Sequence, residues 1–157
     1  MRFSEYMNEW LYGEQGYYAS YRPIGKKGDF YTAVSTSKFF GGSIAKHILS
    51  RIDEGFLRTD SLICEIGAHH GYLLADIIEF FHTLRPELLK TLRFGIVERF
   101  SALRKAQQDY FDESFGNTVT LEHYSDLQEV HEQCTFFIAN EIFDAFACEL
   151  FYKGKIG

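Results

Sequence analysis

The stretch SLICEIGAHHGYLLADIIEFFH, residues 61–82, decides the fold of this protein. Residues 62–66 are mostly apolar without strict alternation, which is typical of a parallel strand buried on both faces. In residues 74–81 the apolar side chains recur at spacings of three and four, which predicts an amphipathic helix. Gly67 and Gly71 lie between these segments and favour a tight turn. The stretch therefore predicts a strand, a turn and a helix in that order.

The same pattern repeats further along the chain. Residues 92–98 predict a second strand, and residues 102–111 predict a helix with Ser101 as its N-cap. Shorter strands are expected at residues 118–122 and 134–140. Alternating strands and helices predict a doubly wound α/β fold with a parallel sheet and right-handed crossovers. In such folds ligands bind beyond the carboxyl ends of the strands.

Two further segments complete the expected organisation. Residues 1–60 form an aromatic-rich helical N-terminal arm that we expect to pack on the core, and residues 61–157 form the sheet domain. The final ELFYKGKIG predicts a strand entering a hairpin turn at Gly154, where the chain stops. We therefore expect a sheet truncated at the C-terminus, with an exposed edge that could pair two chains into a homodimer.

Composition limits the class of protein. With 157 residues, 46% of them hydrophobic and 24% charged, the chain predicts one globular domain. A formal net charge of -6 argues against a nucleic-acid partner, because binding phosphates requires clustered cations. The three cysteines include no CxxC pair, which argues against a disulfide framework or a zinc site. With no apolar run of membrane-spanning length and no signal peptide, we expect a cytoplasmic protein without a membrane partner.

The turn after the first strand is the first candidate site. Its glycines, Gly67 and Gly71, would let a ligand approach the backbone, and the following helix start favours a carboxylate or a phosphate. Glu65, two residues before the first glycine, is typical of methyltransferases, whose cofactor S-adenosylmethionine carries a carboxylate. The GxGxxG pattern of dinucleotide sites is absent, and His69 stands where the pattern ExGxGxG has its middle glycine. A structural turn without a ligand remains the alternative.

Two more acids follow later strands. Glu98 ends the second strand, where a carboxylate can accept hydrogen bonds from both hydroxyls of a ribose, although a solvated acid is the alternative. Asp126 follows the third strand, before a helical turn expected near Leu127. It could bind the adenine amino group or cap that turn, and the sequence leaves both interpretations open.

A third group of polar residues follows the fourth strand. Glu141 and Asp144 could hold a guanidinium by bidentate hydrogen bonds and orient its nitrogen for reaction, or could be ordinary acids at a helix start. The adjacent His69 and His70 point in different directions, and no other His or Cys lies at ligand spacing, so no metal site is expected.

Taken together, these motifs resemble the MidA-type methyltransferases, whose mitochondrial members include an arginine methyltransferase that assists complex I assembly. The similarity covers nearly the whole chain. It consists of YM at residues 6–7, GYY at 16–18, GDFYT at 28–32, FG at 40–41, EIG at 65–67, VE at 97–98, DL at 126–127 and ANExFD at 139–144.

The resemblance implies a Rossmann-like class I methyltransferase sheet with S-adenosylmethionine as cofactor and a protein, through an arginine side chain, as substrate. The implied cofactor residues are Glu65, Gly67, Gly71 and Glu98, with Asp29 and Glu141 near the pocket. Two other hypotheses stay open. One is a non-catalytic binding or assembly module that retains the fold, and the other is a nicotinamide-dependent enzyme.

Overall fold

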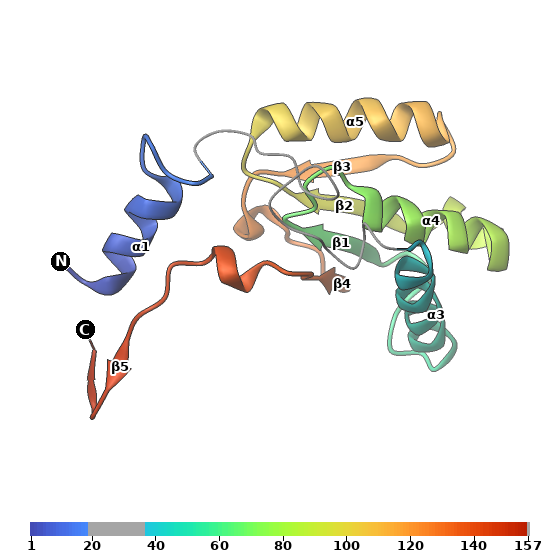
Figure 1. The fold of residues 1–157 in the computed structure, drawn as a ribbon. Helices are drawn as coiled ribbons and strands as arrows, with labels where there is room; N and C mark the ends of the chain where they lie inside the picture. Colours follow the sequence, from blue (N-terminus) through green and yellow to red (C-terminus); the bar gives the residue numbers. More distant parts are fainter. Residues whose placement is uncertain (19–36, 157) are drawn as a thin grey trace. The chain divides into compact units, whose positions relative to one another are not determined.

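The computed structural model describes residues 1–18 and 37–156, drawn as a coloured ribbon in Figure 1. The chain divides into two compact units. One consists of residues 36–140, and the other of residues 1–35 together with residues 141–157.

The larger unit contains a parallel four-stranded sheet. Its strands are β1 (Leu62–Ile66), β2 (Arg93–Val97), β3 (Leu121–Tyr124) and β4 (Thr135–Ile138), in the order β3-β2-β1-β4. Ile66 pairs with Val97 and Val97 with Tyr124, so the carboxyl ends of three strands lie level with one another. The predicted parallel α/β fold is therefore confirmed, with the strand order of a Rossmann-like sheet.

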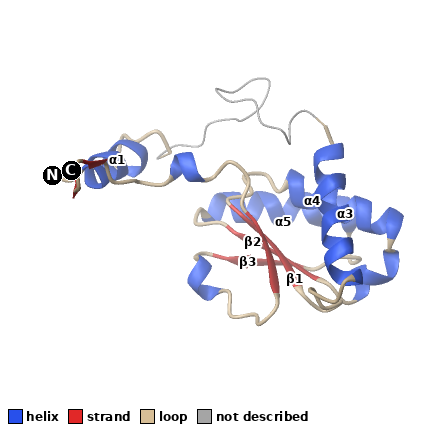
Figure 2. Ribbon diagram, turned by 90° about the horizontal axis from the view of Figure 1, so that it is seen from below, coloured by secondary structure: helices blue, strands red, loops and turns tan. Residues whose placement is uncertain are grey.

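Three helices pack with this sheet: α3 (Phe39–Asp53), α4 (Tyr72–Leu84) and α5 (Ser101–Phe115). The crossovers through α4 and α5 both step in the same direction across the sheet, so right-handed connections place both helices on one face. Figure 2 shows this arrangement, with α3 against α4. Although α3 lies in the predicted N-terminal arm, it packs within the sheet unit, and the domain boundary at residue 60 stays a prediction.

Short 3₁₀ helices complete the larger unit: η1 (Pro86–Lys90) and η2 (Leu127–Glu129). The turn expected near Leu127 is therefore confirmed. Two local predictions are wrong. Ser101 is the first residue of α5 rather than its cap, because Phe100 holds the N-cap position without a side-chain hydrogen bond. The third strand begins at Leu121 rather than at Thr118, whose N–H instead donates to the carbonyl of Phe115 at the end of α5.

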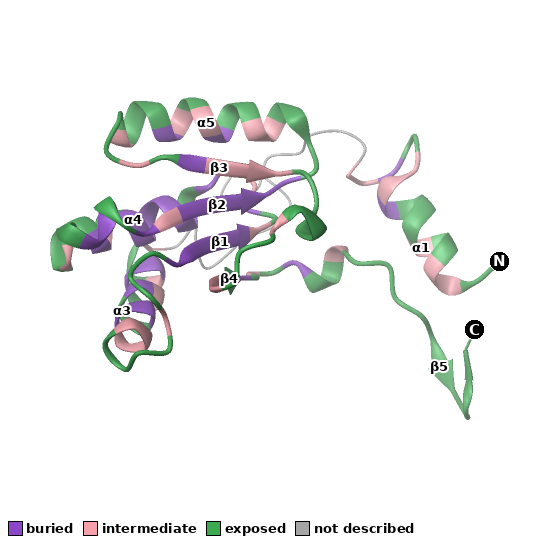
Figure 3. Ribbon diagram, turned by 180° about the vertical axis from the view of Figure 1, so that it is seen from behind, coloured by how far each residue is buried: buried purple, intermediate pink, exposed green. Residues whose placement is uncertain are grey.

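The core lies between the sheet and α4. Figure 3 shows the two central strands, β1 and β2, as mostly buried. On one face the rings of Phe94 and Phe81 pack at a centroid distance of 6.2 Å. The fully buried side chains of this layer each contribute roughly 1.5–3 kcal/mol to folding; they include Ile63, Leu74, Ile77, Ile78 and Ile96. The periodic apolar residues of the opening stretch thus form the predicted buried strand and helix face.

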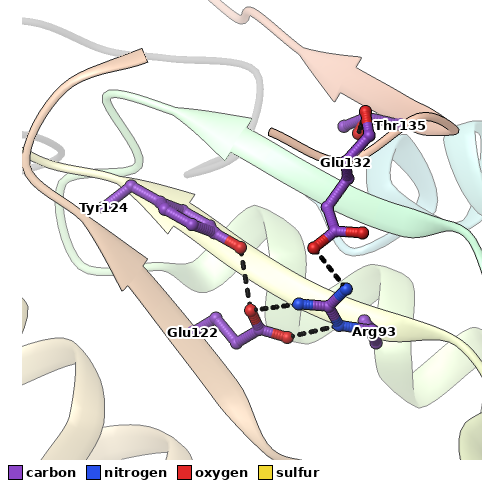
Figure 4. A network of polar contacts seen from close by, with 5 residues as sticks. All are labelled: Arg93, Glu122, Tyr124, Glu132 and Thr135. Atoms are coloured by element: carbon purple, nitrogen blue, oxygen red, sulfur yellow. Dashed lines mark hydrogen bonds and ion pairs between the residues drawn. The ribbon is translucent and has the colours of Figure 1, made fainter. Parts of the chain in front are cut away.

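The opposite face carries a polar network near the amino end of β2. The Arg93 guanidinium donates to both carboxylate oxygens of Glu122, at 2.7 and 2.6 Å, and pairs with Glu132 at 2.5 Å. The Tyr124 hydroxyl donates to the same Glu122 carboxylate at 2.8 Å (Figure 4). The network joins β2, β3 and the segment that leads into β4.

The smaller unit contains α1 (Phe3–Tyr12), the 3₁₀ helix η3 (Phe143–Ala145) and the strands β5 (Phe151–Tyr152) and β6 (Lys155–Ile156). The two strands pair antiparallel around Lys153 and Gly154, whose positive φ angles of 47° and 78° suit a tight hairpin. The hairpin turn predicted at Gly154 is therefore confirmed, but the strand before it is not left without a partner, because β6 pairs with β5. Helix α1 likewise confirms a helix in the aromatic arm.

Candidate cofactor site

The bend between β1 and α4 is built on three left-handed residues. Gly67, His69 and Gly71 have φ angles of 67°, 50° and 79°. The N–H of Gly67 donates to the carbonyl of Val97 at 3.0 Å, and the N–H of Gly71 donates to that of Ala68 at 2.8 Å. These bonds fix the bend beside the end of β2. Left-handed conformations suit glycine, so His69 bears a local conformational cost that the two glycines avoid.

The two glycines have different surroundings. Gly67 is exposed, whereas Gly71 is buried. A Cβ atom added to Gly71 would lie 3.0 Å from Cε2 of Phe111 and 3.4 Å from Cδ1 of Ile96. Gly71 therefore permits close packing of the bend against α5, while Gly67 offers its backbone to solvent or to a ligand.

Glu65 lies beneath this bend, with 5% of its surface exposed. Its Oε2 accepts a hydrogen bond from the N–H of Leu74, in the first turn of α4, at 3.1 Å. Burial raises the pKa of Glu65 to about 8, against the opposing effect of this hydrogen bond. The carboxyl group therefore accepts a hydrogen bond from one of the N–H groups that have no partner within the helix at the start of α4, and it is largely protonated at neutral pH.

Glu98 follows β2 directly and is also buried, with 6% of its surface exposed. Its Oε1 accepts the N–H of Phe100 at 3.0 Å, and burial raises its pKa. The Arg104 guanidinium donates to the main-chain carbonyl of Glu98 at 2.6 Å. The Phe100 N–H occupies one acceptor site on Oε1, and a carboxylate has further lone pairs that can accept a hydrogen bond from a ligand hydroxyl.

Register brings these groups together. Because Ile66 pairs with Val97, the bend that begins at Gly67 and the acid Glu98 leave neighbouring strands at the same level. The structure thus places Glu65, Gly67 and Glu98 at one edge of the sheet, where an α/β fold binds its ligands. Their roles in binding a cofactor stay predictions.

Asp126 caps a turn, as one of its two interpretations expected. Its Oδ1 accepts the N–H of Gln128 at 2.8 Å at the start of η2. The side chain is exposed, and a contact with adenine stays a prediction.

The proposed acceptor residues belong to the smaller unit. Glu141 is exposed and has a φ of 50°, and Asp144 is exposed within η3. Their catalytic assignment stays a prediction. Asp29 lies outside the described residues, so its expected place near the pocket also stays a prediction.

Gln107 is a residue that the sequence analysis missed. It lies in α5 with none of its surface exposed, and its Nε2 donates to the main-chain carbonyl of His69 at 2.7 Å. Its neighbour Gln108 has the same side chain but donates a hydrogen bond to Asp112 on the same helix. The place of Gln107 relative to the apolar face of the helix could have indicated its burial from the sequence, but this signal is weak because the helix is so polar.

Other features lie away from this edge or are absent from the described parts. A hollow of about 360 Å³ is lined by His82, Thr83 and Phe115, at the end of α4 opposite to Gly71. Within residues 1–18 and 37–156, no group of three or more His, Cys, Asp or Glu side chains is placed to hold a metal ion. The helices described there include none with the length and apolar character that crossing a membrane requires.

Comparisons with known proteins agree with one another. The model of the family described as "Putative S-adenosyl-L-methionine-dependent methyltransferase" matches residues 44–157. The protein arginine methyltransferase NDUFAF7, mitochondrial, of Rattus norvegicus is 30% identical over 98% of this chain and 40% of its own length. The Homo sapiens protein of the same name is 25% identical over 98% of this chain and 39% of its own. The chain thus spans about 40% of the length of these curated relatives.

Solved structures match as well. A methyltransferase-like protein from Burkholderia thailandensis, crystallised with S-adenosyl-homocysteine bound, aligns with a TM-score of 0.76 and 25% identity. The alignment covers 95% of this chain and 38% of that one. Together with the family model, which matches well over half of the residues, these similarities define the relationship. The chain belongs to the family of S-adenosyl-L-methionine-dependent methyltransferases.

Proposed function

We propose that this protein is an S-adenosylmethionine-dependent methyltransferase that acts on a protein side chain, with arginine as the acceptor. The observation that carries the proposal is the hydrogen bond from Gly67 to Val97, which sets the glycine bend beside Glu98. The relatives named as protein arginine methyltransferases support the choice of acceptor.

The residues at the sheet edge fit the chemistry of S-adenosylmethionine. That cofactor supplies an electrophilic methyl group on a sulfonium, and it carries a ribose, an ammonium and a carboxylate. Glu98 offers an oxygen to the ribose hydroxyls, and the hydrogen bond from Phe100 holds its carboxylate in place beforehand. The exposed backbone at Gly67 leaves room for close approach.

Glu65 suits the amino acid end of the cofactor. Its carboxyl is buried and largely protonated at neutral pH, so it does not repel an approaching carboxylate. A nearby ammonium favours the charged form, so Glu65 would release its proton and attract that ammonium. The start of α4 adds amides that favour the negative end.

Glu141 and Asp144 are the proposed acceptor residues. Both side chains are exposed, so a guanidinium from another protein can reach them. Paired carboxylates hold a guanidinium through bidentate hydrogen bonds and orient one nitrogen toward the methyl group, which is catalysis by positioning.

Calorimetric titration with S-adenosyl-homocysteine tests cofactor binding. We expect binding by the wild-type chain and a loss of roughly tenfold or more in Glu98→Gln, because the amide has only one acceptor oxygen. Glu113→Gln, an exposed acid on α5, is the matched control and should bind normally. No binding by the folded wild-type chain would refute the proposal. To test the acceptor, we expect labelled methyl groups to be transferred to peptides that contain arginine, but not to the same peptides with lysine in its place.

A non-catalytic binding module is the second candidate. It is favoured by His69, a bulky residue in a left-handed conformation where a glycine would carry no cost. Cofactor binding without methyl transfer to any arginine peptide would support it. Cytoplasmic location and pairing of two chains through a sheet edge also stay predictions, and the mammalian relatives are named as mitochondrial.

A further inference from the structure

A buried glutamine reaches the proposed cofactor bend from a different part of the sheet unit. Gln107, in the second turn of α5, is fully buried, although α5 is otherwise a polar helix. Its Nε2 lies 2.7 Å from the main-chain oxygen of His69, and its Oε1 lies 3.0 Å from Nε2 of His123 on β3. One side chain thus joins three elements: the bend, α5 and β3.

The chemistry of these atoms fixes the direction of both hydrogen bonds. A carbonyl oxygen can only accept, so the amide nitrogen of Gln107 must face His69. The amide oxygen then faces His123, whose Nε2 must carry a hydrogen to donate to it. The chain of donors therefore runs from His123 through Gln107 to the backbone of the bend.

The carbonyl that Gln107 holds belongs to the residue whose conformation is least favourable. His69 has a φ of 50°, and a non-glycine residue keeps such a conformation only where its surroundings impose it. The hydrogen bond from Gln107 and the packing of Gly71 against Phe111 both act on this bend from α5. Together they constrain the bend between Gly67 and Gly71.

We propose that Gln107 is a positioning residue that holds the His69 carbonyl, and with it the backbone of residues 67–71, in the conformation that receives the cofactor. The statement about the ligand rests on the proposed function, whereas the statement about the bend does not. His123 orients Gln107, because its Nε2–H satisfies the amide oxygen and leaves the amide nitrogen facing the bend.

Three variants separate this role from a general contribution to folding. Gln107→Leu removes both hydrogen bonds at similar volume. Gln107→Glu, measured at a pH high enough to ionise this buried carboxyl, keeps an acceptor for His123 but has no hydrogen to donate to His69. Gln108→Leu is the matched control, since Gln108 is adjacent but its Nε2 donates to Asp112 on the same helix.

The first measurement is amide hydrogen exchange without any ligand. We expect the Gly71 amide to exchange roughly tenfold faster in both Gln107 variants, while Ile63 in β1 keeps its rate and Gln108→Leu behaves as wild type. We also expect ¹⁵N spectra to show that His123 loses its preference for the Nε2–H tautomer in Gln107→Leu. Unchanged Gly71 exchange in Gln107→Glu, or in a folded Gln107→Leu, would overturn the proposal.

The second measurement is titration with S-adenosyl-homocysteine. Both Gln107 variants should bind roughly tenfold more weakly than wild type, and Gln108→Leu should bind equally. Faster exchange with unchanged affinity would refute the link between the bend and the ligand. If the wild-type chain itself binds nothing, the proposed function fails, yet the exchange data still decide whether Gln107 holds the bend.

Discussion

Oε2 of Glu65 accepts a hydrogen bond from the N–H of Leu74 at 3.1 Å, so an acid near the end of β1 caps the first turn of α4. The contact joins the strand to the helix across the glycine bend. It also places an ionisable group with 5% exposure inside the sheet unit. The pH dependence of folding therefore reports on the burial of this carboxyl group.

Replacing Glu65 tests that dependence. The pKa of Glu65 is raised from 4.5 to about 8, so the folded chain binds this proton more tightly than the unfolded chain does. The stability it contributes is complete below pH 4.5 and is lost as the pH rises to about 8. In Glu65→Gln, which keeps an acceptor for Leu74, we expect this loss, on the order of a few kcal/mol, to disappear.

Urea unfolding across this pH range measures the effect. Glu113→Gln, at an exposed position, should follow the wild-type curve. Parallel curves for wild type and Glu65→Gln would contradict the assignment of the raised pKa.

His69 offers a test of backbone strain. At a φ of 50°, glycine has no steric penalty, whereas alanine retains the Cβ atom. We expect His69→Gly to be more stable than His69→Ala by about 1 kcal/mol in chemical denaturation. We also expect His69→Gly to bind S-adenosyl-homocysteine at least as tightly as wild type, because glycine keeps the carbonyl that Gln107 holds. Weaker binding would instead indicate that the imidazole contacts the ligand.

Gly71 combines strain with a close contact. Its φ is 79°, and an added Cβ would lie 3.0 Å from the Phe111 ring. Gly55 has a φ of 78° but nothing within 4 Å of such a Cβ. We expect Gly55→Ala to lose about 1 kcal/mol from strain alone, and Gly71→Ala to lose more because the bend must also move away from α5. Equal losses in thermal unfolding would show that the contact with Phe111 is relieved at no cost.

The Arg93 network should stabilise the sheet modestly. The side chains of Arg93 and Glu122 are 41% and 30% exposed, so solvent screens the pair. We expect Glu122→Gln to lose about 1 kcal/mol at neutral pH. Arg93 holds the pKa of Glu122 below its ordinary 4.5, so this contribution is present above pH 4.5 and is lost as the pH falls through the lowered pKa.

Unfolding free energies of wild type and Glu122→Gln at neutral and acidic pH check this. Glu132→Gln, which removes only the second partner of Arg93, should lose less. A difference that persists in acid would show that packing, rather than charge, is responsible.

The order of strands and helices could be predicted from the sequence because apolar periodicity records which faces of each element are buried. The stretch at residues 61–82 has the period of a buried strand and then that of a helix, and the structure has β1 and α4 there. The hairpin at Gly154 and the turn at Leu127 followed from local turn chemistry in the same way. Local predictions failed where a neighbour competed, as when Thr118 bonded to the end of α5 instead of starting a strand.

The partners of the polar residues depended on contacts between segments distant in the chain. Gln107 and Gln108 are neighbouring residues of the same type. The packing of α5 against the bend buries Gln107 beside His69, whereas Gln108 bonds to Asp112 on its own helix. Likewise, the sequence marks Glu65 near the end of the first strand and Glu98 at the end of the second, but the register of β1 on β2 decides that both acids lie at the same edge of the sheet. Periodicity is a property of a single segment, so the sequence by itself determined the elements. Hydrogen-bond partners and pKa shifts arise from the surroundings that other segments create, so only the tertiary structure decided them.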